Sequence, residues 1–502
     1  MLMIFGKQEI PLDKEAGVKV RSSQRSSKLQ YGPQELPIYR GLTLFGGKIG
    51  NPLGPNADGA AFGYSMEREG LRIFRLGYDL FDEVAFLLSH GQPPENAHIP
   101  TLDLHIAMLR QWIVQAGVPL VEIPPRPFNY DFITCLTHDV DFLGIREHKL
   151  DRSVLGFALR VAFPLWVRDI HGRLSWSRIL RNWKALFSLL AVHAGVCNDF
   201  WFDLDRYLDL EKGMPSTFFF IPFKGEAGLP MDGGDPCGRR AAKYDLEKYR
   251  GWIQTLIEKG HEVGLHGLDA WESQERGAKE LDVIRQVTGQ DEVGVRMHWL
   301  YFDEKTPQVL QQTGFLYDSS RGYNDAMGFH GGTAQVFRLP GTDGLYELPL
   351  TIMDTSLFYP DRMGLSEADA LQHVDLIIDA VKANGGVLTI NWHTRSLSPE
   401  RNWDSFYEVL LRKLGSERVW FASARDAVRW FKVRRSVRFG NISLGMNSLK
   451  VKLRGKTEKA YPPLALRVYS PCKKGIGFEQ PFPYRPYIDV PWSGESELEL
   501  PM

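Results

Sequence analysis

The chain has few cysteines, almost no net charge and no long apolar run. Its 502 residues contain four cysteines and no Cys-x-x-Cys pair, which excludes a disulfide scaffold and fits a reducing compartment. The 60 basic and 61 acidic side chains nearly cancel, so we expect no nucleic-acid partner. No stretch approaches the roughly 18 apolar residues of a membrane span, and the first residues lack the apolar core of a signal peptide. The sequence therefore predicts a cytoplasmic protein.

The composition and the length predict a folded chain of several domains. Hydrophobic residues make up 43% of the chain, which is too apolar for a mainly disordered protein. Residues 1–125 form a predicted α+β accessory region, irregular over about the first 50 residues and helical over 64–115. Three prolines in the stretch IPPRPFNY mark its end. Residues 436–502 carry short alternating runs, which predict a small β-rich tail.

Between these regions, residues 126–435 alternate apolar segments with amphipathic ones. The pattern predicts a parallel α/β sheet, and about seven strands favour a barrel over an open sheet. In such barrels the chemistry lies at the carboxyl ends of the strands. The predicted strands are 132–142, 216–223, 261–267, 293–302, 346–353, 385–393 and 418–424. The predicted helices are 245–260, 275–288, 305–313, 366–384, 403–414 and 425–434.

An insertion at about 143–198 interrupts this alternation. It is apolar on one side, and between Ser153 and Gly195 its charges are basic except for Asp169. A basic amphipathic segment of this kind can lie on an anionic membrane surface. The sequence leaves two interpretations open: helices that pack across the barrel, or a peripheral contact through 150–195 with the inner face of the membrane.

Four strand ends carry polar side chains that could perform chemistry. Asp139 and Asp141 stand two residues apart after an apolar run, so both point the same way. Two such carboxylates need a cation or a partner to offset their repulsion, although a turn that caps the next helix would explain them equally well. Together with the histidines of the later segments, they predict a metal site with acid and base groups. Those later segments end in His266, in Arg296 with His298, and in His393.

The order of these motifs resembles that of a known family. LTHDVD, GHEVGLHG, GVRMHWL, ELPL and LTINWH follow the motif order of the polysaccharide deacetylases of the NodB-homology type, carbohydrate esterase family 4. The resemblance implies a distorted (β/α) barrel and metal-dependent hydrolysis of N-acetyl groups on sugars. By matching position, it implies that Asp139 is the catalytic base, that Arg296 orients this base, and that His393 is the catalytic acid. Asp141 resembles the metal-binding aspartate of the family, and His266 resembles its first metal histidine.

One feature of the family is missing. Its second metal histidine stands four residues after the first, and this chain has Ala270 there. We expect His298 to take its place, because His298 shares a strand face with Arg296, and we keep Asp269 as the second choice. The resemblance implies a divalent metal, with zinc preferred and cobalt, manganese, iron or nickel as alternatives.

The resemblance predicts N-deacetylation of an amino sugar in a polysaccharide, an oligosaccharide, a lipid-linked saccharide or an exopolysaccharide precursor. The aspartate that pairs with the catalytic histidine is either Asp354 or Asp318. We expect Trp299, Tyr323 and Trp392 to stack on sugar rings of the carbohydrate substrate. Two alternatives stay open: a carbohydrate-binding barrel without catalysis, which the missing histidine favours, and an amide hydrolase that acts on a C–N bond outside sugars.

Overall fold

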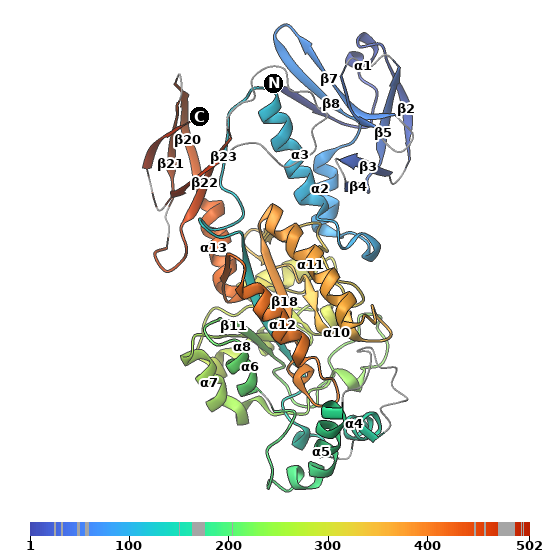
Figure 1. Ribbon diagram of the computed structural model, residues 1–502, viewed down its shortest axis with the longest axis vertical. Coiled ribbons are helices and arrows are strands. Elements are labelled where there is room, and N and C mark those ends of the chain that lie inside the picture. The colour runs from blue at the N-terminus through green and yellow to red at the C-terminus, as the bar shows by residue number, and fades with distance from the viewer. Residues whose placement is uncertain are drawn as a thin grey trace. The chain divides into compact units, whose positions relative to one another are not determined.

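The computed structural model describes residues 1–24, 27–31, 34–47, 51–55, 60–149, 151–162, 176–202, 204–445, 448–455, 458–469, 487–492, 494 and 496–501. The chain divides into two compact units (Figure 1). The predicted N-terminal region and the predicted tail belong to the same unit, which the sequence did not indicate. Unit 1 comprises Met1–Phe128, Gly331–Thr333 and Lys432–Met502, and unit 2 comprises Asn129–His330 and Ala334–Phe431.

Unit 1 contains a six-stranded sheet where the sequence predicted irregular chain. The order is β1-β8-β7-β5-β2, with β6 paired to β7. The prediction was wrong because these strands are short, contain glycine and proline, and pair with partners far along the chain, such as Leu2 opposite Ile73. The strands are β1 (Leu2–Phe5), β2 (Val18–Gln24), β5 (Leu42–Gly47), β6 (Asn51–Pro55), β7 (Ala61–Arg68) and β8 (Leu71–Leu76).

The stretch 64–115, predicted as helical, is strand first and helix afterwards. Its helices are α2 (Leu80–Ser89), which Asp79 caps, and α3 (Thr101–Gln115). The tail joins the N-terminal region, because β22 (Leu464–Tyr469) pairs with β9 (Leu120–Glu122). The other elements of unit 1 are α1 (Pro11–Glu15), β3 (Ser27–Tyr31), β4 (Gln34–Ile38), β20 (Arg438–Leu444), β21 (Ser448–Arg454), β23 (Tyr487–Trp492) and β24 (Ser496–Pro501).

Unit 2 is built on a curled, mainly parallel sheet, which confirms the predicted α/β class. The order is β15-β16-β14-β13-β12-β11-β10-β18-β17, with β19 also paired to β10, and β15 is antiparallel to β16. The carboxyl ends of β10, β12, β13 and β18 lie at one edge. The strands are β10 (Phe132–Val140), β11 (Ser216–Phe220), β12 (Glu262–Gly267), β13 (Val295–Met297), β14 (Tyr317–Asp318), β15 (Phe337–Arg338), β16 (Tyr346–Glu347), β17 (Ile352–Met353), β18 (Val387–Asn391) and β19 (Val419–Phe421).

The segment 346–353, predicted as one strand, changes partner in its middle. Its first part, β16, pairs with β14, and its second part, β17, pairs with β18. Pro349, which has no amide hydrogen to donate, stands between the two parts. One segment thus reaches both ends of the curled sheet and gives it a barrel-like form. The two-residue strands β14 and β15 were not predicted, because runs this short carry no periodicity.

Helices cover this sheet, and their ends follow local rules. α8 begins after Ser273, whose hydroxyl accepts a hydrogen bond from the Arg276 amide, and it ends at Gly289, whose φ of 71° favours glycine. α7 and α8 pack against β12, and α11 packs against β18 (Figure 1). The helices are α6 (Leu204–Leu210), α7 (Arg250–Glu258), α8 (Gln274–Thr288), α9 (Thr306–Thr313), α10 (Asp354–Phe358), α11 (Glu367–Asn384), α12 (Asp404–Gly415) and α13 (Ala424–Ser436).

The insertion adds two helices to unit 2, α4 (Arg152–Ala162) and α5 (Trp176–His193). Their inner faces share a small core, which includes Phe157 and Trp201. Arg181 ties α5 to the start of α12 through an ion pair of 2.7 Å with Asp404. Residues 150 and 163–175 of the predicted membrane-contact segment lie outside the described residues. Within the described part of the chain, no helix is both long and apolar enough to cross a membrane.

Candidate active site

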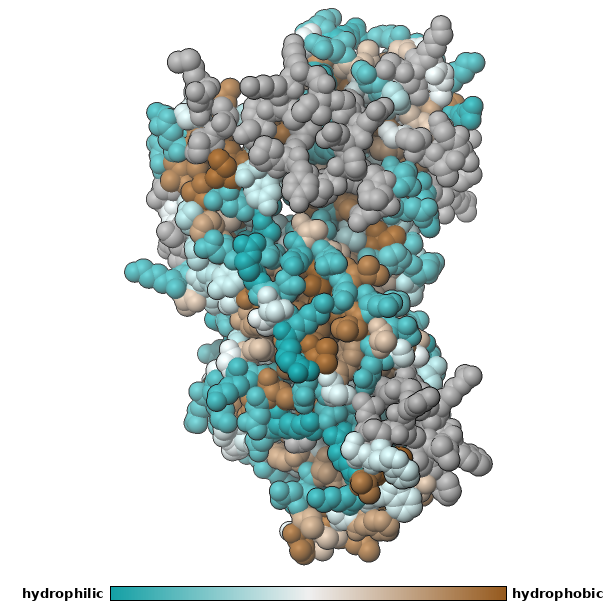
Figure 2. All heavy atoms as spheres, viewed as in Figure 1, coloured by the Kyte–Doolittle hydropathy of each residue, from teal (hydrophilic) through white to brown (hydrophobic). Residues whose placement is uncertain are grey.

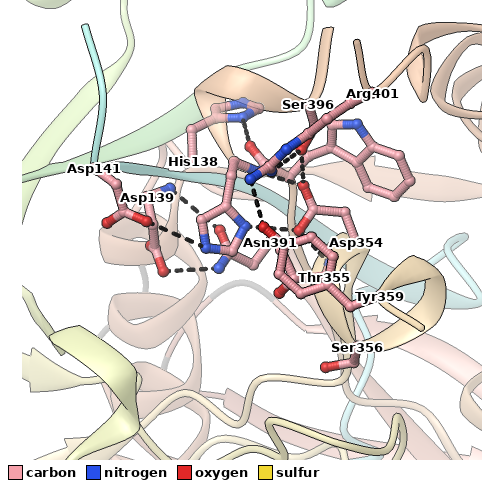
Figure 3. A network of polar contacts seen from close by, with 12 residues as sticks. His138, Asp139, Asp141, Asp354, Thr355, Ser356, Tyr359, Asn391, Ser396 and Arg401 are labelled. Atoms are coloured by element: carbon pink, nitrogen blue, oxygen red, sulfur yellow. Dashed lines mark hydrogen bonds and ion pairs between the residues drawn. The ribbon is translucent and has the colours of Figure 1, made fainter. Parts of the chain in front are cut away.

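The buried carboxylate of Asp139, near the end of β10, is held between two donors. Arg296 Nη1 donates to its Oδ1 at 3.0 Å, and Asn391 Nδ2 donates to its Oδ2 at 2.7 Å. Figure 3 shows Asn391 beside Asp139, with Asp141 on the other side. Burial alone would raise the pKa of Asp139, but its neighbours, His266 and Arg296 foremost, hold it below its ordinary value. Asp139 is therefore an ionised carboxylate in a fixed orientation.

Several contacts fix the orientation of the fully buried Arg296 side chain. Its Nε donates to the Ser319 carbonyl at 3.0 Å, and its Nη2 donates to the Ser319 hydroxyl at 2.9 Å. The Phe219 ring lies against the guanidinium, with 4.6 Å between the Arg296 Cζ and the ring centroid. Gly264 makes room for that ring, because a Cβ there would lie 2.7 Å from it. These contacts aim the remaining guanidinium nitrogen at Asp139.

Asp141, His266 and His298 form a cluster that could hold a metal ion. One ligand atom from each residue lies within 4.8 Å of the others. His266 Nε2 is 3.3 Å and His298 Nε2 is 3.4 Å from Asp141 Oδ1. The Nδ1 of His266 donates to the Arg296 carbonyl at 3.0 Å, which leaves the lone pair on its Nε2 available for a metal. Two imidazoles and one carboxylate are the ligands of an open zinc site.

The polar atoms of this cluster fit a divalent cation. Asp141 Oδ1 is buried and has no hydrogen-bond partner among the described residues. A buried oxygen without a partner is costly unless a cation or another group satisfies it. Burial lowers the pKa of His298 to about 3, so its imidazole is neutral and able to bind a metal at ordinary pH.

The backbone directly after His298 makes an unusual turn. Trp299, with φ of 62°, and Leu300, with φ of 57°, are both left-handed, which costs about 1–3 kcal/mol for each residue that is not glycine. The turn ends β13 and places Trp299 in the wall of the cavity with 40% of its surface exposed. Such strain is concentrated at functional sites.

His393 forms a second charged pair with Asp354, at the start of α10. Its Nδ1 lies 2.6 Å from Asp354 Oδ1, and its backbone amide donates to Asp354 Oδ2 at 2.7 Å. The Ser396 hydroxyl donates to the same carboxylate (Figure 3). Burial lowers the pKa of His393, but Asp354 and the aspartates of β10 raise it overall to about 9. Its Nε2 lies 3.9 Å from Asp141 Oδ2, so the protonated imidazole faces the residues that could hold a metal.

Two residues that the sequence kept as alternatives are engaged elsewhere. Asp269 forms an ion pair of 3.1 Å with Arg276 and is not one of the three residues that could hold a metal. Asp318 is buried near Glu347, and burial raises its pKa to about 6. Asp354, the other candidate, is the aspartate that contacts His393.

The three aromatic residues predicted to bind sugar lie in different environments. Trp299 lines the cavity, as described above. Trp392 is 0% exposed and stacks on Tyr407 with ring centroids 4.9 Å apart, so the prediction for it was wrong. It follows β18 on the face opposite to His393, which is the consequence of strand alternation. Tyr323 is also buried, is absent from the cavity lining, and packs against His330 at 5.0 Å between ring centroids.

Asn391 belongs to the site but was not predicted from the sequence. Besides donating to the Asp139 carboxylate, its Oδ1 accepts a hydrogen bond from the Asp139 amide at 3.2 Å. Asn391 stands two residues before His393 in the motif TINWH, so both share a strand face. This spacing of two residues from His393 could have indicated that Asn391 lies in the site.

Asp139, Asp141, His266, His298, Trp299 and His393 line one cavity of about 180 Å³ in unit 2. Its wall combines the ionised Asp139, the three residues that could hold a metal and the protonated His393 with several arginines. The charged and aromatic lining residues are Asp139, Asp141, His266, His298, His393, Arg239, Arg240, Arg362, Arg395, Arg401, Phe142, Trp299 and Tyr359. A carboxylate base and an imidazolium acid on either side of a metal site can hydrolyse an amide bond.

Similarity to known proteins is limited in extent. No family model matches the chain. The chain is 28% identical over 117 residues to the peptidoglycan deacetylase of Helicobacter pylori (strain ATCC 700392 / 26695), a match that covers 20% of this chain and 40% of that protein. The chain is thus similar to a peptidoglycan deacetylase over part of its length, and the match spans less than half of that protein.

Two solved structures described as polysaccharide deacetylases also align with the chain. The structure from Mycobacterium smegmatis has a TM-score of 0.36 and 21% identity, and the alignment covers 62% of this chain and 94% of that chain. The structure from Pseudomonas aeruginosa PAO1 has a TM-score of 0.39 and 16% identity, and the alignment covers 64% of this chain and 97% of that chain.

Proposed function

We propose that this deacetylase relative removes the acetyl group from an N-acetylated amino sugar by metal-dependent hydrolysis. One observation carries the proposal: the Asp139–Arg296 pair and the His393–Asp354 pair meet at the cavity that also holds the metal cluster. A sugar-binding barrel without catalysis has no need of an ionised base and a protonated acid in one cavity. The arrangement therefore favours the enzyme over the binding module.

The mechanism follows from the atoms that face the cavity. A divalent cation held by Asp141, His266 and His298 would supply a Lewis acid that polarises the acetyl carbonyl and acidifies water. Asp139 accepts a proton from the water that attacks the carbonyl carbon, while Arg296 keeps this carboxylate ionised and oriented. The new C–O bond forms at the acetyl carbon, and the C–N bond then breaks.

His393 completes the reaction by giving its Nε2 proton to the departing nitrogen. Asp354 holds the other ring nitrogen and favours the protonated imidazole, so the acid is charged before the reaction begins. The products are acetate and a free amino sugar. Trp299, which is half exposed on the cavity wall, is the aromatic surface on which a sugar ring can stack.

Acetate release tests this function. The substrates are chitooligosaccharides, nucleotide-linked N-acetylamino sugars and small amides outside sugars, each assayed with the metal-loaded chain. We expect release from at least one N-acetylated sugar, and a loss of about 100-fold or more in kcat for Asp139→Asn and for His393→Gln. Release from the small amides alone would favour the amide hydrolase instead. Sugar binding without release from any substrate would favour the binding module.

The insertion presents an apolar surface, and we infer that it contacts an anionic membrane. Along α5 the side chains of one face are exposed, from 39% for Trp183 to 84% for Leu190. The exposed apolar residues of the two helices are Leu155, Leu159, Trp176, Leu180, Trp183, Phe187 and Leu190. Figure 2 shows brown side chains gathered at the lower end of the view, over this part of unit 2.

The positive charge of the two helices favours an anionic membrane as the partner of this surface. The sequences of α4 and α5 contain arginine and lysine and no aspartate or glutamate. Exposed tryptophan and leucine with flanking basic residues are typical of helices that lie in the interface of anionic lipids. The inner side of α5 is fixed by Arg181, so the apolar face stays outward. A peripheral contact with the inner membrane face would bring the cavity near lipid-linked saccharides.

Vesicle flotation tests the contact. The full chain is mixed with phosphatidylglycerol vesicles or with phosphatidylcholine vesicles, beside the variants Phe187→Ser and Leu190→Ser. Leu376→Ser, which changes an exposed leucine of α11, is the matched control. We expect flotation with phosphatidylglycerol vesicles, and its loss in the two α5 variants alone. Equal flotation of all variants would overturn the proposal, as would self-association through this face instead of flotation.

A further inference from the structure

Arginine dominates the charged wall of the active-site cavity. Five arginines line it, against the two aspartates of the β10 strand end. They come from separate loops: two follow β11, one follows α10, and two follow β18. Asp139 already has a countercharge in Arg296, and Asp141 would have one in a cation held with His266 and His298. The wall therefore carries more positive charge than the proposed reaction uses.

Four of these arginines have no carboxylate partner among the described residues. Arg240 is buried and donates to the carbonyls of Leu229 at 2.8 Å and Leu268 at 2.9 Å. Its Nε is buried without a hydrogen-bond partner in the described part of the chain. Structural arginines are normally paired, as Arg395 is with Glu400 at 2.9 Å. Unpaired guanidinium groups in a cavity wall need another reason.

The other three unpaired arginines stand where a ligand can reach them. Arg239 is exposed, and no hydrogen bond is formed by its side chain within the described residues. Arg362 donates to the Thr355 hydroxyl at 2.8 Å and lies over the Tyr359 ring at 5.2 Å. Arg401 donates to the hydroxyls of Ser396 and Tyr359 and lies 5.3 Å from the centroid of the Tyr359 ring. Each guanidinium retains donors beyond these neutral contacts, since arginine carries five N–H groups.

The arginines of the wall also lie close enough to affect one another. Burial lowers the pKa of Arg395 to about 10, and Arg401 and Arg160 act in the same direction, against the opposing effect of Glu400. Like charges so close destabilise one another unless an anion lies between them. A neutral sugar polymer would give no compensation, because hydroxyl and acetamido groups carry no charge.

We propose that the substrate carries an anionic group, a phosphate or a carboxylate, which Arg239 and Arg362 bind beside the acetamido group. The proposal rests on the proposed function, since it names the substrate class of the same cavity. Guanidinium groups bind phosphate and carboxylate oxygens through paired, charge-assisted hydrogen bonds. Arg240 and Arg401, which line the same cavity, add to its positive potential.

Anion binding to the metal-free chain is the first test, because it requires no catalysis. Inorganic pyrophosphate is titrated by calorimetry into the chelator-treated wild type, into the double variant Arg239→Ala/Arg362→Ala, and into Arg412→Ala. Arg412 is an exposed arginine of α12 outside the cavity, so this variant controls for the loss of a surface charge away from the site. We expect binding by the wild type and by Arg412→Ala, and a Kd raised at least tenfold in the double variant. Equal binding by all three would overturn the proposal, as would no binding by the wild type.

Turnover separates a failure of this proposal from a failure of the proposed function. Acetate release is compared for N-acetylamino sugars that carry a phosphate, a carboxylate or no charge. We expect kcat/KM at least tenfold higher for one of the two charged classes, decreasing with added salt. The preferred class identifies the source of the anion. Equal kcat/KM for all three would overturn the anionic substrate and leave the deacetylase intact, whereas no release from any would remove the deacetylase itself.

Discussion

Replacing Asp354 with asparagine tests the role of His393 as the proton donor. The Asp354 carboxylate is fully buried and lies 2.6 Å from Nδ1 of His393, so water screens its charge little. Against the opposing effect of burial, Asp354 and the nearby aspartates raise the pKa of His393 to about 9. One opposite charge at this distance shifts a pKa by about 1–3 units. Asp354→Asn should therefore lower the pKa of His393 by about 2 units, or ~2.7 kcal/mol.

The pH dependence of kcat/KM measures this shift. A proton donor must be protonated before the reaction, so kcat/KM decreases as pH rises through the pKa of His393. We expect the decrease to begin about 2 pH units lower in Asp354→Asn than in the wild type. A bound cation lowers the pKa of His393 in both proteins, so the difference between them is the tested quantity. Ser396→Ala removes a neutral donor to the same carboxylate and should shift the profile by less than about half a unit. An unchanged profile in Asp354→Asn would show that Asp354 does not raise the pKa of a proton donor at His393.

Three further substitutions test the packing that positions the site. Gly264→Ala should lower the free energy of unfolding by about 1–3 kcal/mol in urea, because its Cβ would lie 2.7 Å from the Phe219 ring; a change below about 0.5 kcal/mol would show that the ring moves freely. Trp392→Phe should also lower this free energy, by about 1–3 kcal/mol, without changing KM; a raised KM would contradict its place in the core. Asp404→Asn should destabilise the chain by about 2 kcal/mol through the lost ion pairs with Arg181 and Arg206, and an unaltered thermal midpoint would show that these pairs do not anchor α5 and α6.

The strands of unit 2 could be predicted because their residues are buried on both faces. β10, for example, is buried at every position, and such a run stands out from its amphipathic neighbours. The strands of unit 1 could not be predicted, because their pairing depends on residues far apart. β1 lies beside β8, and neither strand has a local sequence pattern that indicates its pairing partner. The glycines and prolines between them indicated loops and hid the sheet.

The site could be predicted as far as strand ends determine it. Asp139, Asp141, His266 and His393 all lie on the cavity wall, because the carboxyl ends of neighbouring parallel strands meet at one edge. The partner of His393 could not be selected from the sequence. Asp354 contacts that histidine only because β17 turns into α10 beside β18, and no local pattern shows this.

The arginines of the wall were missed for a related reason. Arg239 and Arg362 belong to loops that carry no motif, and their sequence neighbours have no periodicity. Only the fold brings these loops to the same cavity. Charge accumulated from separate loops is a property of the tertiary structure, and a single sequence contains no signal for it.

The metal content of the purified chain shows whether Asp141, His266 and His298 bind a divalent cation. Mass spectrometry compares the wild type with His266→Ala, His298→Ala and Asp269→Ala after incubation with zinc and removal of the excess. We predict about one divalent ion per chain in the wild type and in Asp269→Ala, and a loss of most of the bound metal in the two histidine variants. A wild type that takes up no metal would exclude this metal site, and so would a loss confined to Asp269→Ala.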